Sequence, residues 1–359
     1  MPIFARYPSP INKTNGEFLF LKFTILYPKN RKAFEMQIIQ IKKNDAGQRL
    51  DKFLTKALPT LPMSLLYKYL RLKKIKLNRK RCEANTILAE GDEITLFIKD
   101  EFFEKKSEDA FRVLTPKIDV VYEDENVLLV NKRAGMIVHS DDKEDTNTLI
   151  SHIKAYLYRK GEYDPDQEQS FAPALCNRID RNTCGIVIAA KNAEALRVIN
   201  EKIKERSIKK KYLAAAHGHF DKKEDTLRGY LTKDSDKNLV TVYTKKPKDA
   251  PAHEIKEIIT KYRTLAEKNG NTLLEVELVT GRTHQIRAHF SSINHPLVGD
   301  GKYGINKNDR AKGYKFQALC SYQVTFDFPA EGILQSIAGK TVSLKKDSIW
   351  FVKDLFGWE

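Results

Sequence analysis

The sequence has few cysteines, and they are too widely spread to define a metal site or a disulfide framework. The four cysteines, Cys82, Cys176, Cys184 and Cys320, form no Cys-x-x-Cys pair. Structural zinc sites and small disulfide-rich domains both need such ligands at short, regular spacings. The eight histidines also lack Cys or acidic companions at ligand spacing. We therefore expect no metal, and this cysteine usage favours a reducing compartment, the cytosol.

Long apolar runs are absent as well. The longest early apolar stretch, Phe18 to Tyr27, is interrupted by Lys22 and has no small-residue cleavage site after it. A transmembrane helix needs about 20 mainly apolar residues, and a signal peptide needs a cleavage site. We expect neither a membrane span nor a signal peptide.

Acidic residues are outnumbered, and in one stretch they are missing. The chain has 63 Lys and Arg against 47 Asp and Glu, which is a net charge of +16. Between residues 68 and 81 there are eight basic residues and no acidic one, namely Lys68, Arg71, Lys73, Lys74, Lys76, Arg79, Lys80 and Arg81. A solvated charged face usually explains a basic run. This run contains no acids that would neutralise it, so we predict that it contacts the phosphates of a nucleic acid.

The 359 residues, 41% of them apolar, suffice for two or three domains with their own cores. Residues 1–35 show no clear period, and we expect an N-terminal extension, with Met36 as an alternative native start. Residues 36–98 predict a compact unit of two helices, one from Arg49 to Pro59 and one opening at Pro62, with strands near 75–78 and 93–98. Residues 99–116 are charged and irregular and predict a linker.

From residue 117 onward, strand and helix patterns alternate, which predicts an α+β domain over residues 117–359. Residues 127–132 and 186–190 are short apolar runs typical of buried strands. Residues 273–279 alternate in polarity, so we expect a strand with one face in water.

One polar segment directly precedes the second buried strand. In it Asp180 stands between Arg178 and Arg181, and residues 183–185 predict a turn into the strand. A rigid strand would hold this loop at the mouth of a sheet, where side chains can meet a ligand. The alternative is an ordinary surface loop with solvated ion pairs.

Residues 177–185, Asn-Arg-Ile-Asp-Arg-Asn-Thr-Cys-Gly, resemble the catalytic motif of the RluA-type pseudouridine synthases, His-Arg-Leu-Asp-x-x-Thr-Ser-Gly. Asn177 replaces the family's usual His, and Cys184 its Ser. Three further segments resemble the family in the family's order: residues 131–139, where Arg133 replaces a Pro, residues 210–214 and residues 280–289, which are followed by 295–304. Residues 36–98 resemble the small αL-type RNA-binding module that precedes the catalytic domain in one branch of the family.

The resemblance implies a mixed, mainly antiparallel catalytic domain that isomerises uridine to pseudouridine in RNA, without a cofactor. It implies that Asp180 is the catalytic carboxylate, that Arg287 pairs with it and that Tyr212 is the active-site aromatic. Arg178 would enter the RNA stack as the target base is flipped out, and further RNA contacts are expected from Arg181, Thr183, Arg282 and His284.

The expected partner is RNA, most of all large-subunit ribosomal RNA, because the branch with this module mostly acts there, and we expect a monomer. Two other functions stay open. One is a catalytically inactive RNA-binding protein in ribosome assembly, and the other is a hydrolase that releases free uracil. A glycoside hydrolase normally uses two cooperating carboxylates, whereas the resemblance implies only Asp180.

Overall fold

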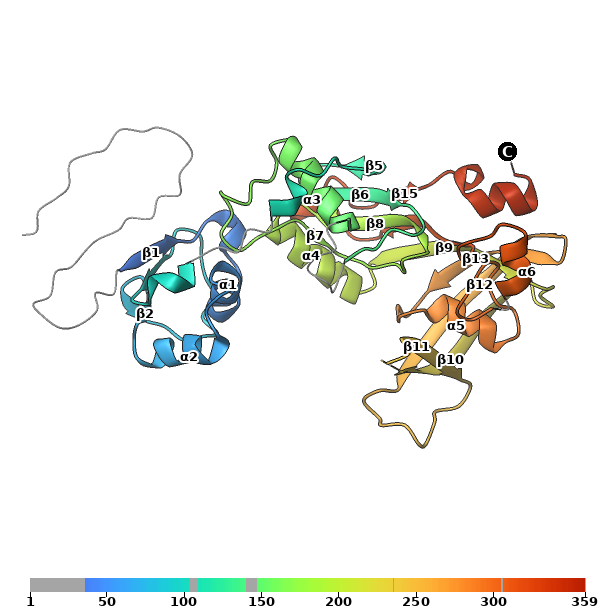
Figure 1. The fold of residues 1–359 in the computed structure, drawn as a ribbon, viewed down its shortest axis with the longest axis horizontal. Helices are drawn as coiled ribbons and strands as arrows, with labels where there is room; N and C mark the ends of the chain where they lie inside the picture. The colour runs from blue at the N-terminus through green and yellow to red at the C-terminus, as the bar shows by residue number, and fades with distance from the viewer. Residues whose placement is uncertain (1–35, 104–108, 140–146, 235, 305, 359) are drawn as a thin grey trace, which may run out of the picture. The chain divides into compact units, whose positions relative to one another are not determined.

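The structure is a computed structural model that describes residues 36–358 apart from 104–108, 140–146, 235 and 305. The described residues divide into two compact units (Figure 1). Unit 1 contains the described residues up to 103 together with Asp164–Ser170, and unit 2 contains the others. The predictions for residues 1–35 lie outside the described residues.

Unit 1 packs two helices against a small antiparallel sheet. Its elements are β1 (Gln37–Gln40), α1 (Leu50–Ala57), α2 (Met63–Arg71), β2 (Ile75–Leu77), β3 (Lys80–Arg81) and β4 (Glu93–Leu96), with strand order β1-β4-β2-β3. Leu50, Phe53 and Leu54 of α1 lie three or four residues apart on one face and are buried in the unit's core. The two helices and the strands near 75–78 and 93–98 are thus where the sequence predicts them.

The segment Asp164–Ser170 belongs to unit 1 although unit 2 precedes and follows it in the chain. Ser170 Oγ donates a hydrogen bond to the buried Asp45 carboxylate at 2.6 Å and accepts one from Gln48 Nε2 at 2.9 Å. The sequence pattern does not indicate that this segment joins unit 1, because the residues that it contacts lie more than a hundred positions away along the chain.

Unit 2 is built on one long, mixed sheet (Figure 1). Its strands are β5 (Val120–Glu123), β6 (Val127–Lys132), β7 (Ala174–Leu175), β8 (Cys184–Ala190), β9 (Ile208–His217), β10 (Glu224–Asp234), β11 (Leu239–Tyr243), β12 (Lys256–Lys268), β13 (Asn271–Leu278), β14 (Leu319–Phe326) and β15 (Thr341–Ser343). The main path runs β11-β10-β12-β13-β9-β14-β8-β6-β5. Within the described residues only β14 and β8 pair in parallel, which confirms a mixed sheet that is mainly antiparallel.

Helices cover both faces of this sheet. α3 (Leu149–Arg159), α4 (Ala193–Lys204) and α5 (Gln285–Ser292) pack on it, and a short helix, α6 (Asn306–Ala311), follows α5 in the chain. Helices α3 and α5 bury apolar residues in the same core as Leu128 and Val130 of β6, whereas α4 packs in the core that contains Val127 and Leu129. Successive residues of a strand point to opposite faces, so these helices lie on opposite sides of the sheet.

The water-facing side predicted for residues 273–279 is wrong. Residues 272–276 of β13 are all buried. Leu274 and Val276 face the core that contains α5, and Leu273 faces a core closed by the C-terminal segment around Phe351. The polar Glu275 that suggested a wet face is instead satisfied inside the protein by Tyr322, Lys211 and Arg263.

No helix in the described part of the chain is long and apolar enough to cross a membrane.

Candidate active site

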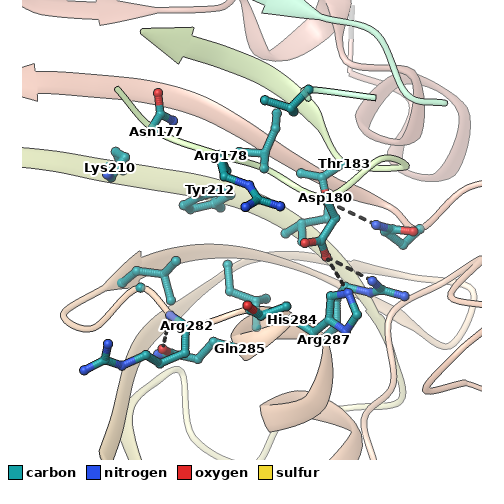
Figure 2. Close-up of a pocket in the computed structure, with 18 of the residues that line it drawn as sticks. Asn177, Arg178, Asp180, Thr183, Lys210, Tyr212, Arg282, His284, Gln285 and Arg287 are labelled. Atoms are coloured by element: carbon teal, nitrogen blue, oxygen red, sulfur yellow. Dashed lines mark hydrogen bonds and ion pairs between the residues drawn. The ribbon is translucent and has the colours of Figure 1, made fainter. Parts of the chain in front are cut away.

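Asp180 lies on the loop between β7 and β8, which several polar contacts hold in place (Figure 2). Asn177 Oδ1 accepts a hydrogen bond from the Ile188 backbone N–H at 2.8 Å, which fixes the start of the loop to β8. The buried Lys132 ammonium donates to the carbonyl of Arg181 at 2.8 Å. Lys132 was assigned no role from the sequence, although it ends the buried run 127–132 and lies in the resembling segment 131–139.

The turn before β8 lies at residues 181–182, so the turn predicted at residues 183–185 is wrong. Strand β8 already begins at Cys184, because Cys184 and Gly185 pair with Cys320 and Ser321 of β14. Gly185 has φ +113°, and a Cβ atom there would lie 2.3 Å from the Ser321 carbonyl oxygen. Only glycine allows this close approach of the two strands.

Arg287 of α5 connects Asp180 to a second, fully buried carboxylate. Its Nη1 donates to Asp180 Oδ2 at 2.9 Å, while Nε and Nη2 both donate to Asp300 at 2.8 Å. Burial alone would lower the pKa of Arg287, but the two carboxylates raise it above its ordinary value. Burial would likewise raise the pKa of Asp300, and Arg287 outweighs it and lowers that pKa. Asp300 therefore fixes the guanidinium that reaches Asp180.

Asp300 was not assigned a role from the sequence. Its signal is an acidic residue that directly follows the apolar segment Leu297-Val298-Gly299.

His284 turns toward Asp180. It precedes α5 in a left-handed conformation, with φ 54°, and its Nδ1 lies 2.8 Å from the Tyr303 hydroxyl. Its Nε2 is 4.0 Å from Asp180 Oδ2. Burial lowers the pKa of His284, as do Arg287 and Lys302, although Asp180 opposes them. His284 is thus a neutral neighbour of the carboxylate at neutral pH.

Tyr212 of β9 forms a wall of the same pocket (Figure 2). The side chain is buried, and burial raises the pKa of its phenol to about 12. The hydroxyl is therefore protonated at neutral pH, so it can donate a hydrogen bond or a proton but is not a base.

The pocket that contains these residues has a volume of about 1550 Å³ and is strongly cationic. Twelve Lys or Arg residues line it, against two acids, Asp180 and Glu277. Arg178, Arg181 and Arg282 line the pocket and are exposed, so their guanidinium groups are accessible to a ligand. A cleft with this excess of one charge attracts a polyanion.

Thr183 also borders the pocket, but its side chain is used inside the protein. It is 2% exposed, and its hydroxyl accepts a hydrogen bond from Gln317 Nε2 at 3.1 Å. Gln285, which the sequence did not single out, fixes the neighbouring loop: its Oε1 accepts from the Arg282 N–H at 3.1 Å, and its Nε2 donates to the Ile259 carbonyl at 3.1 Å.

The eight basic residues of the run 68–81 lie in unit 1 and line no part of this pocket. Lys74 and Lys76 are half-buried over the rings of Tyr69 and Phe97, and the other six are exposed. In the residues that the structure describes, no three His, Cys, Asp or Glu side chains come together as a set of metal ligands.

Comparison with known proteins agrees with this geometry. A sequence model of the RNA pseudouridylate synthase family matches residues 126–292. An RNA pseudouridine synthase of Mycoplasma genitalium is 34% identical over 296 residues, which cover 80% of this chain and 88% of the relative. Ribosomal large subunit pseudouridine synthase C of Buchnera aphidicola is 32% identical over 274 residues, which cover 76% and 82% of the two chains.

A solved structure, human RNA pseudouridylate synthase domain containing 1, has the same fold. It aligns with a TM-score of 0.50 at 22% identity, over 68% of this chain and 86% of the human one.

This chain therefore belongs to the RluA-type RNA pseudouridine synthases. It is an enzyme that isomerises uridine to pseudouridine in RNA, and the inactive alternative has no support among these relatives.

Proposed function

We propose that this synthase modifies uridines of large-subunit ribosomal RNA and that Asp180 is its catalytic carboxylate. The observation that carries the proposal is the ionic contact between Asp180 and the buried Arg287, within a cation-lined pocket. The substrate class is supported by relatives from Buchnera aphidicola and Vibrio cholerae, whose names specify the ribosomal large subunit.

The two carboxylate oxygens of Asp180 differ in their hydrogen bonding. Oδ2 accepts from Arg287, and Oδ1 has no hydrogen-bond partner among the described residues. Breaking the bond between uracil and ribose leaves an electron-poor sugar, and a carboxylate can stabilise it, trap it, or add to the base. The base is then turned and rejoined through carbon, with no redox step and no net hydrolysis, so the reaction uses no cofactor.

Two more residues complete the proposed site. Arg178 is exposed two residues before Asp180, where its planar cation can fill the RNA stack as the target base leaves it. Tyr212 offers a ring that can stack on the uracil and a protonated phenol that can donate to it. Arg181, Arg282 and His284 are proposed as RNA contacts, and His284 is also close to Asp180.

We infer that unit 1 is an αL-type RNA-binding module. Its two helices on a small sheet and its exposed basic run support this assignment. Such a module would supply affinity that falls with salt, while unit 2 selects the uridine. We further propose that the enzyme is a cytoplasmic monomer.

Release of tritium from carbon five of uridine in ribosomal RNA transcripts tests the function, with Asp180→Asn beside the parent. We expect release by the parent and none by the variant. Asp327→Asn, on the surface beside Lys209, is the matched control and should keep full activity. Free uracil among the products would indicate a hydrolase, and absence of release from any ribosomal or transfer RNA would indicate an inactive RNA-binding protein. Mapping pseudouridines in RNA from a deletion strain then identifies the sites.

A further inference from the structure

Lys210 is a half-buried cation whose ammonium lacks an anionic partner in the described residues. It lies on β9 two residues before Tyr212 and lines the same pocket (Figure 2). Within the described residues its ammonium makes no hydrogen bond or ion pair and no carboxylate acts on it, whereas Lys209 pairs with Asp327 and Lys211 with Glu275. Its neighbour Cys176 is neutral, because burial raises the pKa of that thiol to about 12. Partial burial lowers the pKa of Lys210, because removal from water disfavours the charged form of an unpaired ammonium.

Asn177 adds an unpaired donor to the pocket. Its Oδ1 must face the Ile188 N–H that donates to it, so the orientation of the amide is fixed. The opposite atom, Nδ2, is buried and has no hydrogen-bond partner among the described residues. A buried donor left unsatisfied is costly, because it has lost its hydrogen bonds to water without gaining another. Both residues line the same pocket, and the thiol of Cys176, which directly precedes Asn177, acts on Lys210.

A ligand for these two groups must offer acceptor oxygens and a negative charge. A uracil carbonyl would satisfy the amide but leave the ammonium unpaired, whereas a phosphodiester satisfies both. We propose that Lys210 and Asn177 form a phosphate-binding subsite that holds the RNA backbone beside the target nucleotide. The subsite is about 7 Å along β9 from Tyr212. It rests on the proposed function in that the pocket is taken to receive RNA.

Binding of a fluorescein-labelled oligouridylate to the full chain, measured over a range of salt concentrations, tests the subsite. Lys210→Gln is expected to weaken binding about tenfold or more, since a hydrogen bond to a charged group contributes about 1.5–3 kcal/mol. The slope of log K against log salt should become shallower by about 0.7, the value for one phosphate contact on a single strand. Lys210→Arg should keep the slope. Asn177→Asp should weaken binding more, because it keeps Oδ1 but presents a carboxylate to the phosphate.

Lys353→Gln, which removes an exposed charge outside the pocket, is the control and should change neither affinity nor slope. A probe with single neutral methylphosphonates tests the contact from the RNA side: one position should weaken binding to the parent and have no effect with Lys210→Gln. An unchanged salt slope in Lys210→Gln, or equal sensitivity of parent and variant to every methylphosphonate, would overturn the subsite. If the subsite behaves as expected but no RNA is modified, the proposed function fails and the subsite stands.

Discussion

The pocket around Asp180 and the basic run of unit 1 are both rich in charge, but they hold their charges in opposite ways. Arg287 is 7% exposed and donates three hydrogen bonds to two carboxylates. The charged groups of Lys80 and Arg81 are exposed and make no ion pair or hydrogen bond in the part of the chain that the structure describes. A charge that is fixed by hydrogen bonds can act on one atom of a substrate. Free charges instead contribute to RNA affinity through the number of phosphates that they neutralise together.

The difference explains why the two regions should respond differently to substitution. In the pocket Arg287 is bonded to two carboxylates, so its loss leaves both of them without their cation. In the basic run six of the eight side chains are exposed, so the losses from substituting them should add in small steps. Substitutions that violate this rule would show that the run contains a specific contact or that the pocket tolerates rearrangement.

The strongest loss of RNA modification is expected from Arg287→Met. It leaves Asp300 buried without its cation and removes the partner of Asp180. Breaking a buried ion pair destabilises a protein by about 3–5 kcal/mol. We expect loss of tritium release together with a lower free energy of unfolding. Unfolding can be monitored by the fluorescence of the two tryptophans, Trp350 and Trp358, which both lie in unit 2. Arg282→Met, at an exposed position of the same pocket, should leave the stability unchanged; equal destabilisation would contradict the role of Asp300.

A smaller loss is expected from Tyr212→Phe, which keeps the ring and removes the phenol. If the hydroxyl donates a proton or hydrogen bond to the substrate, the rate should fall about 10²-fold. Since the pKa of Tyr212 is about 12, the parent should show no loss of rate from ionisation of this phenol as the pH rises from 7 to 10. Single-turnover rates against pH check both statements, and a parent rate that falls near pH 10 while that of Tyr212→Phe does not would refute them.

Single substitutions in the basic run should have modest effects. Lys80→Gln is expected to weaken RNA binding a few-fold and to reduce the salt slope by about 0.9 for a contact to duplex RNA, taking the value for duplex DNA. The rate at saturating RNA should not change, because the side chain is distant in sequence from the pocket and does not line it. Titrations of Lys80→Gln, Arg81→Gln and the double variant measure additivity. A single substitution that abolishes binding would show that the run recognises one defined site.

The smallest effect on catalysis is expected from Glu275→Gln, although Glu275 is as buried as Arg287. Burial would raise the pKa of this carboxyl, but hydrogen bonds from Tyr322, Lys211 and Arg263 hold it at about 2, below its ordinary value of 4.5. The charged form thus stabilises the fold above pH 4.5, by on the order of 3 kcal/mol, and this contribution disappears as the pH falls from 4.5 toward 2. Urea unfolding across that range should show a weaker pH dependence in Glu275→Gln than in the exposed control Glu257→Gln. Loss of RNA modification in Glu275→Gln would contradict its structural role.

Local patterns predicted the elements well where one face or a whole run is apolar. The helix from Leu50 and the strand over residues 127–132 follow from spacing alone. The pattern failed for residues 273–279, because the polar Glu275 points into a buried cluster whose members come from three other strands. Alternation in one segment does not reveal what covers its second face.

The residues of the candidate site also fall into those that the sequence motifs predicted and those that they did not. The resemblance of residues 177–185 and 280–289 predicted that Arg287 pairs with Asp180, and the two side chains are in contact. It did not reveal Asp300, Lys132 or the unpaired donor of Asn177, because these depend on contacts across the fold. Of the three consecutive lysines before Tyr212, the pattern could not distinguish which one is free; neighbouring strands pair Lys209 and Lys211 and leave Lys210.

Composition thus predicted a polyanionic partner and the basic run, and the resemblance of short motifs predicted the enzyme class and the loop of Asp180, because these predictions depend on residue type and local order. Which charges are free, which are neutralised and which atoms converge on Asp180 depends on packing between strands and helices that are far apart in the chain. Burial and hydrogen bonding set the protonation and orientation of each group, and both are properties of the folded molecule.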